Sequence, residues 1–258
     1  MAMAQIIAVS NQKGGVGKTT TSVNLSASLA AAGHKSLLID FDPQRNASTG
    51  LSIKNTEMNI YSLLSGNSSF VDSVRDTAIK NLYLLPSTMD LAALEFELAH
   101  NAGRESCLKN CLNDCVKDFE FVFIDCPPSF GILSLNAWVA ADYVLIPLQC
   151  EYYALEGLVS LLNNVLRIKR GFNKTLEVSG VVLTMHDKRS SLTQQIEADV
   201  RQNLGEKVYK TVIPRNVKIA EAPSHGKPVL TYDIRCPGTI AYLELATEFL
   251  RKHGASLK

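Results

Sequence analysis

The feature that most restricts the fold of this chain is the stretch IIAVSNQKGGVGKTTTSVNLSASLAAAG, residues 6–33. An apolar run comes first, three closely spaced glycines follow, and an Ala-, Ser- and Leu-rich segment then stops at Gly33. Glycine tolerates the left-handed backbone of tight turns, and it often follows the last turn of a helix. The order predicts a strand, a tight loop and a helix over 17–32, which is the first unit of an α/β fold.

Apolar runs recur along the chain and alternate with helix-like segments. Most are continuous runs of Val, Ile, Leu and Phe, which is typical of strands buried on both faces of a parallel sheet. The sequence predicts one α/β domain over residues 1–258, a three-layer, mostly parallel sheet with helices on both faces. Segment 43–80, rich in Asn, Ser, Thr and Gly, is expected to hold a mobile loop and short helices. Strands are expected at 5–10, 35–41, 82–87, 120–126, 142–149, 176–185 and 207–214, and helices at 17–32, 89–116, 132–141, 154–170, 191–204 and 238–253.

The glycine-rich loop has the composition of a phosphate-binding loop. Gly14, Gly15 and Gly17 allow a tight bend in which backbone N–H groups point at phosphate oxygens, and the following helix adds a partial positive charge. Lys18 is expected to bridge the β- and γ-phosphates, and Thr19 to offer its hydroxyl to Mg²⁺. The alternative, a glycine-rich turn without a ligand, is disfavoured because Gly17-Lys18-Thr19 stands between a strand and a helix.

Carboxylates follow two of the expected strands. Asp40 and Asp42 end the run SLLIDFD, and Asp125 ends FVFID. An aspartate at a strand end is often only a turn residue or a helix cap. Open α/β sheets bind ligands at the carboxyl ends of their strands, so we expect these three side chains to lie near the phosphate-binding loop.

Lys13 has no evident role in holding one triphosphate, because Lys18 and the backbone amides suffice. The string KGGVGKTT resembles the deviant Walker A loop of the ParA/MinD family of P-loop ATPases, and the resemblance extends over nearly the whole chain. In that family the early lysine reaches the nucleotide of a second copy, so the resemblance implies an ATP-dependent homodimer in which Lys13 contributes to catalysis. It also implies that ATP is bound by Lys13, Gly14, Gly15, Val16, Gly17, Lys18, Thr19 and Thr20.

The same resemblance assigns the remaining site residues. Asp125 corresponds to the aspartate that contacts Mg²⁺ through water, with Asp40 as a partner one step further from the metal, and Asp42 to the residue that positions the attacking water. Pro214 and Asn216 correspond to positions that contact adenine. One departure stands out, because the family's usual DPQGN is DPQRN here, with Arg45 in place of glycine.

Within the family, the chain is most similar to the ParA/Soj branch, which segregates chromosomes or plasmids. Arg189, in HDKR, and Lys218 match positions where that branch presents basic residues to DNA. This implies nonspecific binding to double-stranded DNA by the ATP dimer and release through hydrolysis stimulated by a ParB/Spo0J-like partner. Two alternatives stay open: a MinD-like ATPase on a membrane surface, and a module that binds ATP but scarcely hydrolyses it. The sequence ends LATEFLRKHGASLK, which offers little apolar surface for a membrane anchor, so no membrane partner is expected.

Charge and cysteine content complete the sequence predictions. Residues 1–158 hold 10 Lys/Arg and 16 Asp/Glu, a balance of −6, whereas residues 159–258 hold 16 and 9, a balance of +7. The basic C-terminal hundred residues suit a polyanion partner, although scattered solvated charges would give the same totals. Cys107, Cys111 and Cys115 are spaced for one stripe of a helix, where core packing is favoured over a metal site. A cytoplasmic, nucleoid-associated protein is expected.

Overall fold

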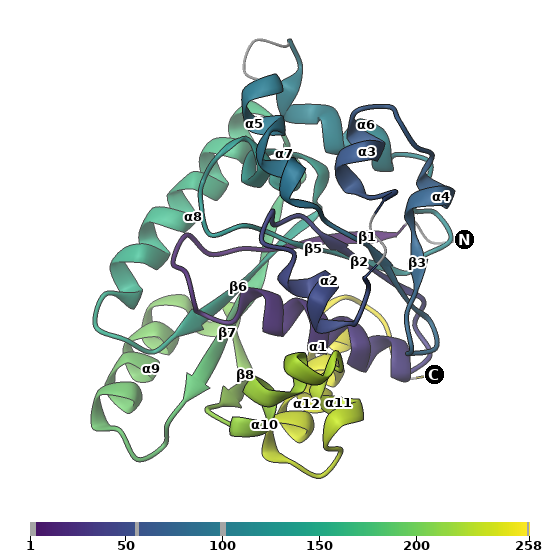
Figure 1. Ribbon diagram of the computed structural model, residues 1–258. Coiled ribbons are helices and arrows are strands. Elements are labelled where there is room, and N and C mark those ends of the chain that lie inside the picture. Colours follow the sequence, from purple (N-terminus) through teal and green to yellow (C-terminus); the bar gives the residue numbers. More distant parts are fainter. Residues whose placement is uncertain (1–3, 55–56, 99–101, 257) are drawn as a thin grey trace.

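A single eight-stranded sheet organises the molecule (Figure 1). The computed structural model describes residues 4–54, 57–98, 102–256 and 258. The strand order is β3-β4-β2-β5-β1-β6-β7-β8, and every neighbouring pair is parallel except β3 and β4. The mostly parallel α/β sheet predicted from the apolar runs is therefore confirmed. The strands are β1 (Gln5–Val9), β2 (Ser36–Asp40), β3 (Arg75–Asp76), β4 (Leu82–Leu85), β5 (Phe121–Asp125), β6 (Tyr143–Gln149), β7 (Glu177–His186) and β8 (Val208–Pro214).

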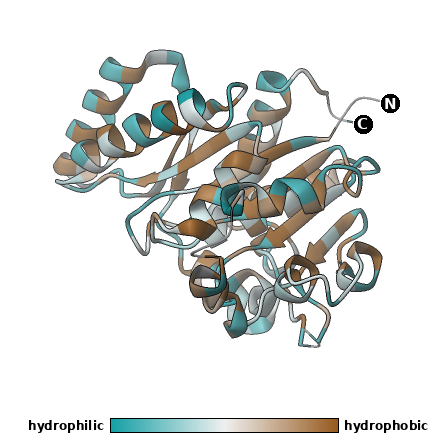
Figure 2. Cartoon of the chain, turned by 90° about the horizontal axis from the view of Figure 1, so that it is seen from above, coloured by the Kyte–Doolittle hydropathy of each residue, from teal (hydrophilic) through white to brown (hydrophobic). Residues whose placement is uncertain are grey.

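Helices cover both faces of the sheet. Successive strand residues alternate between two cores: Ile7 and Val9 pack with α1 and α12, whereas Ala8 packs with the core that includes α6, α7, α8 and α9. In Figure 2 the strands are largely brown between helices of mixed colour, as expected for strands buried on both sides. The α-helices are α1 (Lys18–Ala31), α2 (Asn46–Gly50), α3 (Ile60–Leu64), α4 (Phe70–Ser73), α5 (Leu94–Glu97), α6 (Cys107–Leu112), α7 (Ile132–Ala140), α8 (Ala154–Gly171), α9 (Ser191–Leu204), α10 (Val217–Glu221), α11 (Val229–Tyr232) and α12 (Pro237–Lys252); the 3₁₀ turns are η1 (Met89–Ala92), η2 (Arg104–Ser106), η3 (Gly205–Lys207) and η4 (Ala222–His225).

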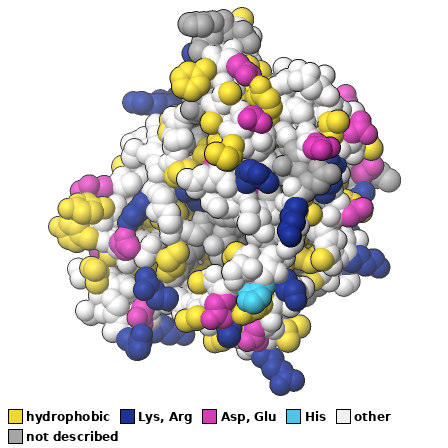
Figure 3. Space-filling view, viewed as in Figure 1, with side chains coloured by type: hydrophobic (Ala, Val, Ile, Leu, Met, Phe, Trp, Pro, Cys, Tyr) yellow, Lys and Arg dark blue, Asp and Glu magenta, His cyan; other side chains and the backbone are white. Residues whose placement is uncertain are grey.

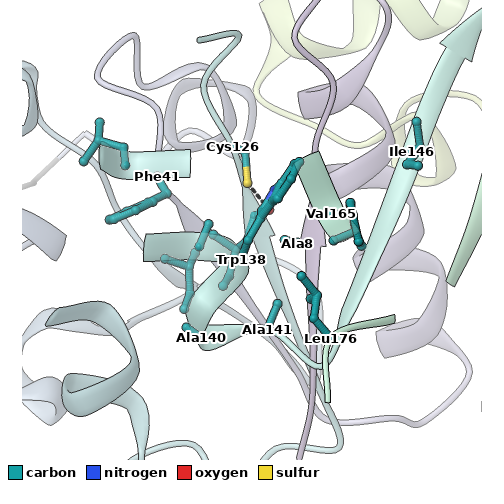
Figure 4. Close-up of a cluster of buried hydrophobic side chains, with 14 of the residues drawn as sticks. Ala8, Phe41, Cys126, Trp138, Ala140, Ala141, Ile146, Val165 and Leu176 are labelled. Carbon is teal, nitrogen blue, oxygen red and sulfur yellow. Dashed lines mark hydrogen bonds between the residues drawn. The ribbon is translucent and has the colours of Figure 1, made fainter. Parts of the chain in front are cut away.

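Trp138 fixes helix α7 against the sheet. Its side chain is fully buried in a cluster to which Ala8 of β1 and Val165 of α8 also belong (Figure 4). The Phe130 ring lies 5.0 Å from the Trp138 ring, centroid to centroid. Replacing a buried tryptophan with alanine typically costs about 3–5 kcal/mol. This packing holds α7 and therefore the end of the β5–α7 connection, which starts directly after Asp125.

The helix predicted over 89–116 is wrong. Its described parts are η1, α5, η2 and α6, which are separate short helices. Gly103 precedes η2 with a left-handed backbone (φ 75°), which interrupts a continuous α-helix. The three-cysteine stripe fails with it: Cys107 and Cys111 are half-buried on α6, but Cys115 lies beyond the helix and is exposed, so it is not a core residue.

The irregular segment 43–80 contains the short helices α2, α3 and α4, as predicted, and also strand β3, which was not predicted. The two residues of β3 are both charged, so no apolar run marks them. The short helices α10 and α11 were not predicted either. No helix within the described residues is both long enough and apolar enough to span a membrane.

The register between β6 and β7 skips one residue. Val144 pairs with Val178 and Leu145 with Gly180, which leaves Ser179 as the extra residue of a bulge. Gly180 has a φ of 155°, and a Cβ atom built there would lie 2.6 Å from the Tyr209 ring and 2.7 Å from the Lys207 carbonyl oxygen. Only glycine fits this position without displacing the backbone.

Candidate functional site

The β1–α1 loop is held in place by bonds to two other strands. Gly15 and Gly17 have φ values of 74° and 90°, a conformation that favours glycine. Asn11 accepts a hydrogen bond from the Lys13 N–H at 3.0 Å and donates one to the Pro147 carbonyl at 2.8 Å. From β7, the Thr184 hydroxyl donates to the Val16 carbonyl at 2.8 Å. The loop is therefore preorganised.

Lys18 is the cation within this loop. Its side chain is buried, and its ammonium donates to the Lys13 carbonyl at 3.0 Å. Burial lowers the pKa of Lys18, and the nearby Asp125, Cys126 and Asp42 oppose that shift. A buried ammonium in a glycine-rich loop at the N-terminus of a helix suits a phosphate group.

Asp40 and Asp125 are register partners on adjacent strands, both fully buried. One oxygen of Asp40 accepts from the Ser48 N–H at 2.7 Å and from the Ser48 hydroxyl at 2.6 Å, so this carboxylate anchors α2. Burial raises the pKa of Asp40 to about 6. Burial, with the charge of Asp40, raises the pKa of Asp125 to about 8.

The two carboxylate oxygens of Asp125 differ in their hydrogen bonding. Its Oδ1 accepts from the Ser22 hydroxyl at 2.9 Å, whereas its buried Oδ2 has no hydrogen-bond partner among the described residues. The Thr19 side chain lies close enough to this carboxylate to oppose the rise in the pKa of Asp125. Carboxylate and hydroxyl oxygens are hard donors of the kind that Mg²⁺ takes together with waters. Thr19 and Asp125 thus fit a magnesium ion, and Asp40 lies beside Asp125 on the adjacent strand.

A cavity of 320 Å³ opens over the β1–α1 loop. Asp42 lies on its wall, is buried, and accepts a hydrogen bond from the Gln44 N–H at 2.9 Å. The cavity is lined by Gly14, Gly15, Gly17, Lys18, Thr19, Thr20, Asp42, Gln44, Asn46, Pro128 and Met185. The cavity brings together the glycines, the buried lysine and the expected water-positioning aspartate.

A second, mainly apolar cavity of 450 Å³ adjoins the first. The two share Gly17, Thr20 and Met185, and together they make one cleft with a polar end and an apolar end. Pro214 and Asn216, the expected adenine contacts, lie at the apolar end. The cleft has the shape and polarity of a nucleoside triphosphate site.

The sequence did not reveal Met185 or Thr184. Met185 lines both cavities and has a left-handed backbone (φ 49°), which is rare for a non-glycine residue. Such outliers gather at functional sites. Neither residue belongs to a recognisable motif, and a positive φ at methionine leaves no mark in the sequence.

Six expected site residues do not line this cleft: Val16, Asp40 and Asp125, which are buried, and Lys13, Arg189 and Lys218. Lys13 is half-exposed and its ammonium is ion-paired with Glu151. The side chain of Arg189 is 90% exposed and paired with Asp187. Lys218 is ion-paired with Glu221 at 3.0 Å.

Charged side chains are distributed unevenly over the surface in Figure 3. Several Lys and Arg side chains lie close together at the lower left, and others along the bottom are interspersed with acidic ones. The positive balance of the C-terminal hundred residues therefore does not form one unbroken basic patch on this face.

Arg45 occupies a position that favours glycine. Its backbone is left-handed (φ 60°), and it precedes the first residue of α2. This conformation explains why a glycine is usual here. The Arg45 Nε is buried and has no hydrogen-bond partner among the described residues. A buried unpaired donor of this kind costs about 1–3 kcal/mol.

The parallel sheet, the glycine loop and the strand-end aspartates define a P-loop nucleoside triphosphatase. A family profile described as an AAA domain matches residues 4–178. The chain is 48% identical over 252 residues to the chromosome partitioning protein ParA of Caulobacter vibrioides, which covers 96% of this chain and 94% of that protein. It is 49% identical over 248 residues to the sporulation initiation inhibitor protein Soj of Bacillus subtilis, covering 95% of this chain and 98% of the relative.

A solved structure supports the same fold. Cobyrinic acid a,c-diamide synthase of Mycobacterium smegmatis, with bound ADP and magnesium, superposes with a TM-score of 0.85 at 34% identity, over 99% of this chain and 98% of the other. The chain belongs to the ParA/Soj family of P-loop ATPases.

Proposed function

We propose that this chain is a Mg²⁺-dependent ATPase of chromosome or plasmid partitioning that alternates between an ATP-bound dimer on DNA and an ADP-bound monomer. The cleft favours ATP because its apolar end, with Pro214 and Asn216, is shaped for a base, and its polar end offers Lys18 to the phosphates. Asp42 orients a water molecule toward the γ-phosphorus. When bound, Mg²⁺ neutralises phosphate charge.

The position of Lys13 supports dimerisation most directly. Its ammonium does not line the phosphate cavity but lies at the surface beside Glu151. The next two residues, Tyr152 and Tyr153, are 75% and 67% exposed, which is unusual for adjacent aromatic side chains. A half-exposed lysine beside exposed aromatic rings suits a surface that closes against a second copy, where Lys13 reaches the second copy's nucleotide.

The proposal for DNA binding depends on Arg189 and Lys218. Both cations are at the surface, and each is paired with one acidic residue. Surface ion pairs of this kind contribute at most about 1 kcal/mol, so phosphate groups can displace the carboxylates. Two copies double the number of cations, and a salt-sensitive, sequence-independent affinity follows from counterion release. We expect a ParB-like partner to stimulate hydrolysis.

Dimerisation is tested by gel filtration with light scattering at saturating ATP and Mg²⁺. Asp42→Ala, which blocks hydrolysis, should be a dimer, whereas Asp42→Ala combined with Lys13→Ala should bind ATP equally well but remain a monomer. Lys80→Ala, at an exposed lysine in the β3–β4 turn, is the matched control. A dimer that survives the loss of Lys13 would refute the proposed role of this lysine.

DNA retention is tested separately, with ATP, with ADP and without nucleotide. Retention should require ATP and should weaken in Arg189→Glu without loss of ATP binding, whereas Lys80→Glu should have little effect. Retention of Arg189→Glu equal to that of the wild type at low salt would place the DNA surface elsewhere. ATP-dependent binding to liposomes in place of DNA would favour the MinD-like alternative.

A further inference from the structure

A third cavity, of 510 Å³, borders the β2–α2 loop and η1. It is lined by Pro43, Gln44, Arg45, Thr49, Met89 and Ala92. Only Gln44 is shared with the phosphate cavity. None of the residues assigned to ATP, Mg²⁺ or DNA lines this cavity, so the proposed function gives it no role.

Arg45 supplies this cavity with a cation that lacks a counter-ion. Arginine is charged at every physiological pH. The side chain forms no ion pair with any described residue, and its buried Nε donates no hydrogen bond within that part of the chain. A guanidinium that lines a cavity without an acidic partner is a strong partner for an oxyanion, because arginine can donate two parallel hydrogen bonds to it.

The rest of the lining indicates what accompanies the anionic group. The Gln44 amide oxygen accepts a hydrogen bond from Asn46 at 3.2 Å, which leaves its NH₂ group as a donor, and Thr49 adds a hydroxyl. Pro43, Ala92 and the 75% exposed Met89 form an apolar wall. A few polar groups on a largely apolar surface are characteristic of small-molecule pockets, and the volume lies within their usual range.

We propose that this cavity binds a small molecule that has one phosphate or carboxylate group and a compact apolar body. Arg45 pairs with the anionic group, Gln44 and Thr49 orient it, and the apolar body lies against Met89 and Ala92. Because Gln44 and Asp42 belong to the same loop, an occupied cavity restrains the loop that lines the phosphate site. The ligand therefore modulates nucleotide turnover from outside the nucleotide cleft.

The test uses the Nε–H resonance of Arg45 in the full-length chain labelled with ¹⁵N-arginine, assigned by its loss in Arg45→Lys. The nucleotide cleft is first saturated with ADP and Mg²⁺. Phenyl phosphate and benzoate are the probes, and phenol, inorganic phosphate and an oligoglutamate peptide are the comparisons. At least one probe should shift the resonance saturably, and Arg45→Gln should weaken its binding, measured by calorimetry, by about tenfold or more.

Four results would overturn the proposal. The first is an Arg45 resonance that neither probe moves, and the second is an equal shift at the exposed Arg235, which would indicate nonspecific ion binding. The third is an affinity for phenol or for inorganic phosphate equal to that for the probes. The fourth is a response to the acidic peptide alone. The readout is local to Arg45 and needs no hydrolysis. A chain that proves unable to dimerise or to bind DNA would therefore leave this test intact, and a failure here would leave the proposed function intact.

Discussion

The two ends of the strands in the central sheet differ in how fully their buried polar groups are hydrogen-bonded. We call the side where the parallel strands end the carboxyl edge, and the side where they begin the amino edge. At the carboxyl edge, Asp125 Oδ2 and Arg45 Nε are buried without partners among the described residues, and Arg45 and Met185 have left-handed backbones. At the amino edge, the half-buried ring of His253 has partners at both nitrogens, Gln5 Oε1 at 2.6 Å and Ser179 Oγ at 2.9 Å.

The difference indicates that the amino edge adds to the stability of the fold and that the carboxyl edge lowers it. His253 stacks on Phe249 with ring centroids 4.0 Å apart, and Tyr143 meets it edge-on at 4.6 Å. Satisfied polar groups in tight packing stabilise the amino edge. Unpaired donors and acceptors at the carboxyl edge lower stability and leave groups free for ligands, a division that is common in enzymes.

The largest expected effect is on the rate of ATP hydrolysis, and it tests whether residues at the carboxyl edge take part in catalysis. Asp42→Ala should lower the rate of ATP hydrolysis by about 10²–10⁴-fold, because the attacking water loses its orienting carboxylate. Phosphate release measures the rate, and the melting temperature should change little. Asp76→Ala, at an exposed aspartate of β3, is the control. An unchanged rate would support the alternative in which the chain binds ATP without appreciable hydrolysis.

The amino edge should respond in the opposite way. His253→Ala should lower the free energy of unfolding by about 2–4 kcal/mol, because it removes a packed ring and two hydrogen bonds. ATP affinity should remain within twofold or so of the wild type, since the site lies at the other edge. Urea denaturation and nucleotide titration measure the two quantities. A variant as stable as the wild type would contradict the role given to this edge.

The same histidine should make stability depend on pH. Burial lowers the pKa of His253 to about 4. The unfolded chain, with an ordinary histidine pKa of about 6.5, then binds more protons than the folded chain between these values, and stability falls as pH falls through that window. From pH 7 to pH 5 we expect a loss of about 1–2 kcal/mol that His253→Gln reduces. His225→Gln, at an exposed histidine, is the control variant.

The smallest effect concerns Arg45. Arg45→Gly should raise the free energy of unfolding by about 0.5–1 kcal/mol, because the removal of a left-handed side-chain conformation and a buried unpaired donor is partly offset by the greater freedom of glycine in the unfolded chain. Ser52→Gly, at another left-handed residue, tests the backbone contribution alone. If thermal denaturation shows equal gains for both variants, the unpaired Nε has no measurable cost.

Much of this architecture could be predicted because its signals are local. The continuous apolar runs predicted seven of the strands, and the GKTT motif predicted where the phosphate cavity lies. The aspartates could be placed together because the carboxyl ends of parallel strands share an edge. The two-residue β3 has no apolar run. A single glycine inside a helical pattern is often tolerated, so Gly103 alone does not predict the break that the structure shows there.

The contributions of Met185 and Thr184 could not be predicted for a different reason. Their importance depends on how β7 pairs with its neighbours, which is a property of the folded sheet. The partner of Lys13 in the single chain, Glu151, is likewise 138 residues away in the sequence.

The extra residue at Ser179 links the two edges of the sheet. Side chains of a strand alternate between its faces, so one inserted residue reverses the parity of all that follow. The bulge at Ser179, five residues before Thr184, places Thr184 on the face from which its hydroxyl reaches the Val16 carbonyl. The bulge requires Gly180, because only glycine fits there beside Tyr209. The face of the sheet on which Thr184 lies is thus determined near the opposite end of β7. Gly180 therefore helps to determine the shape of the nucleotide cleft although it does not line it.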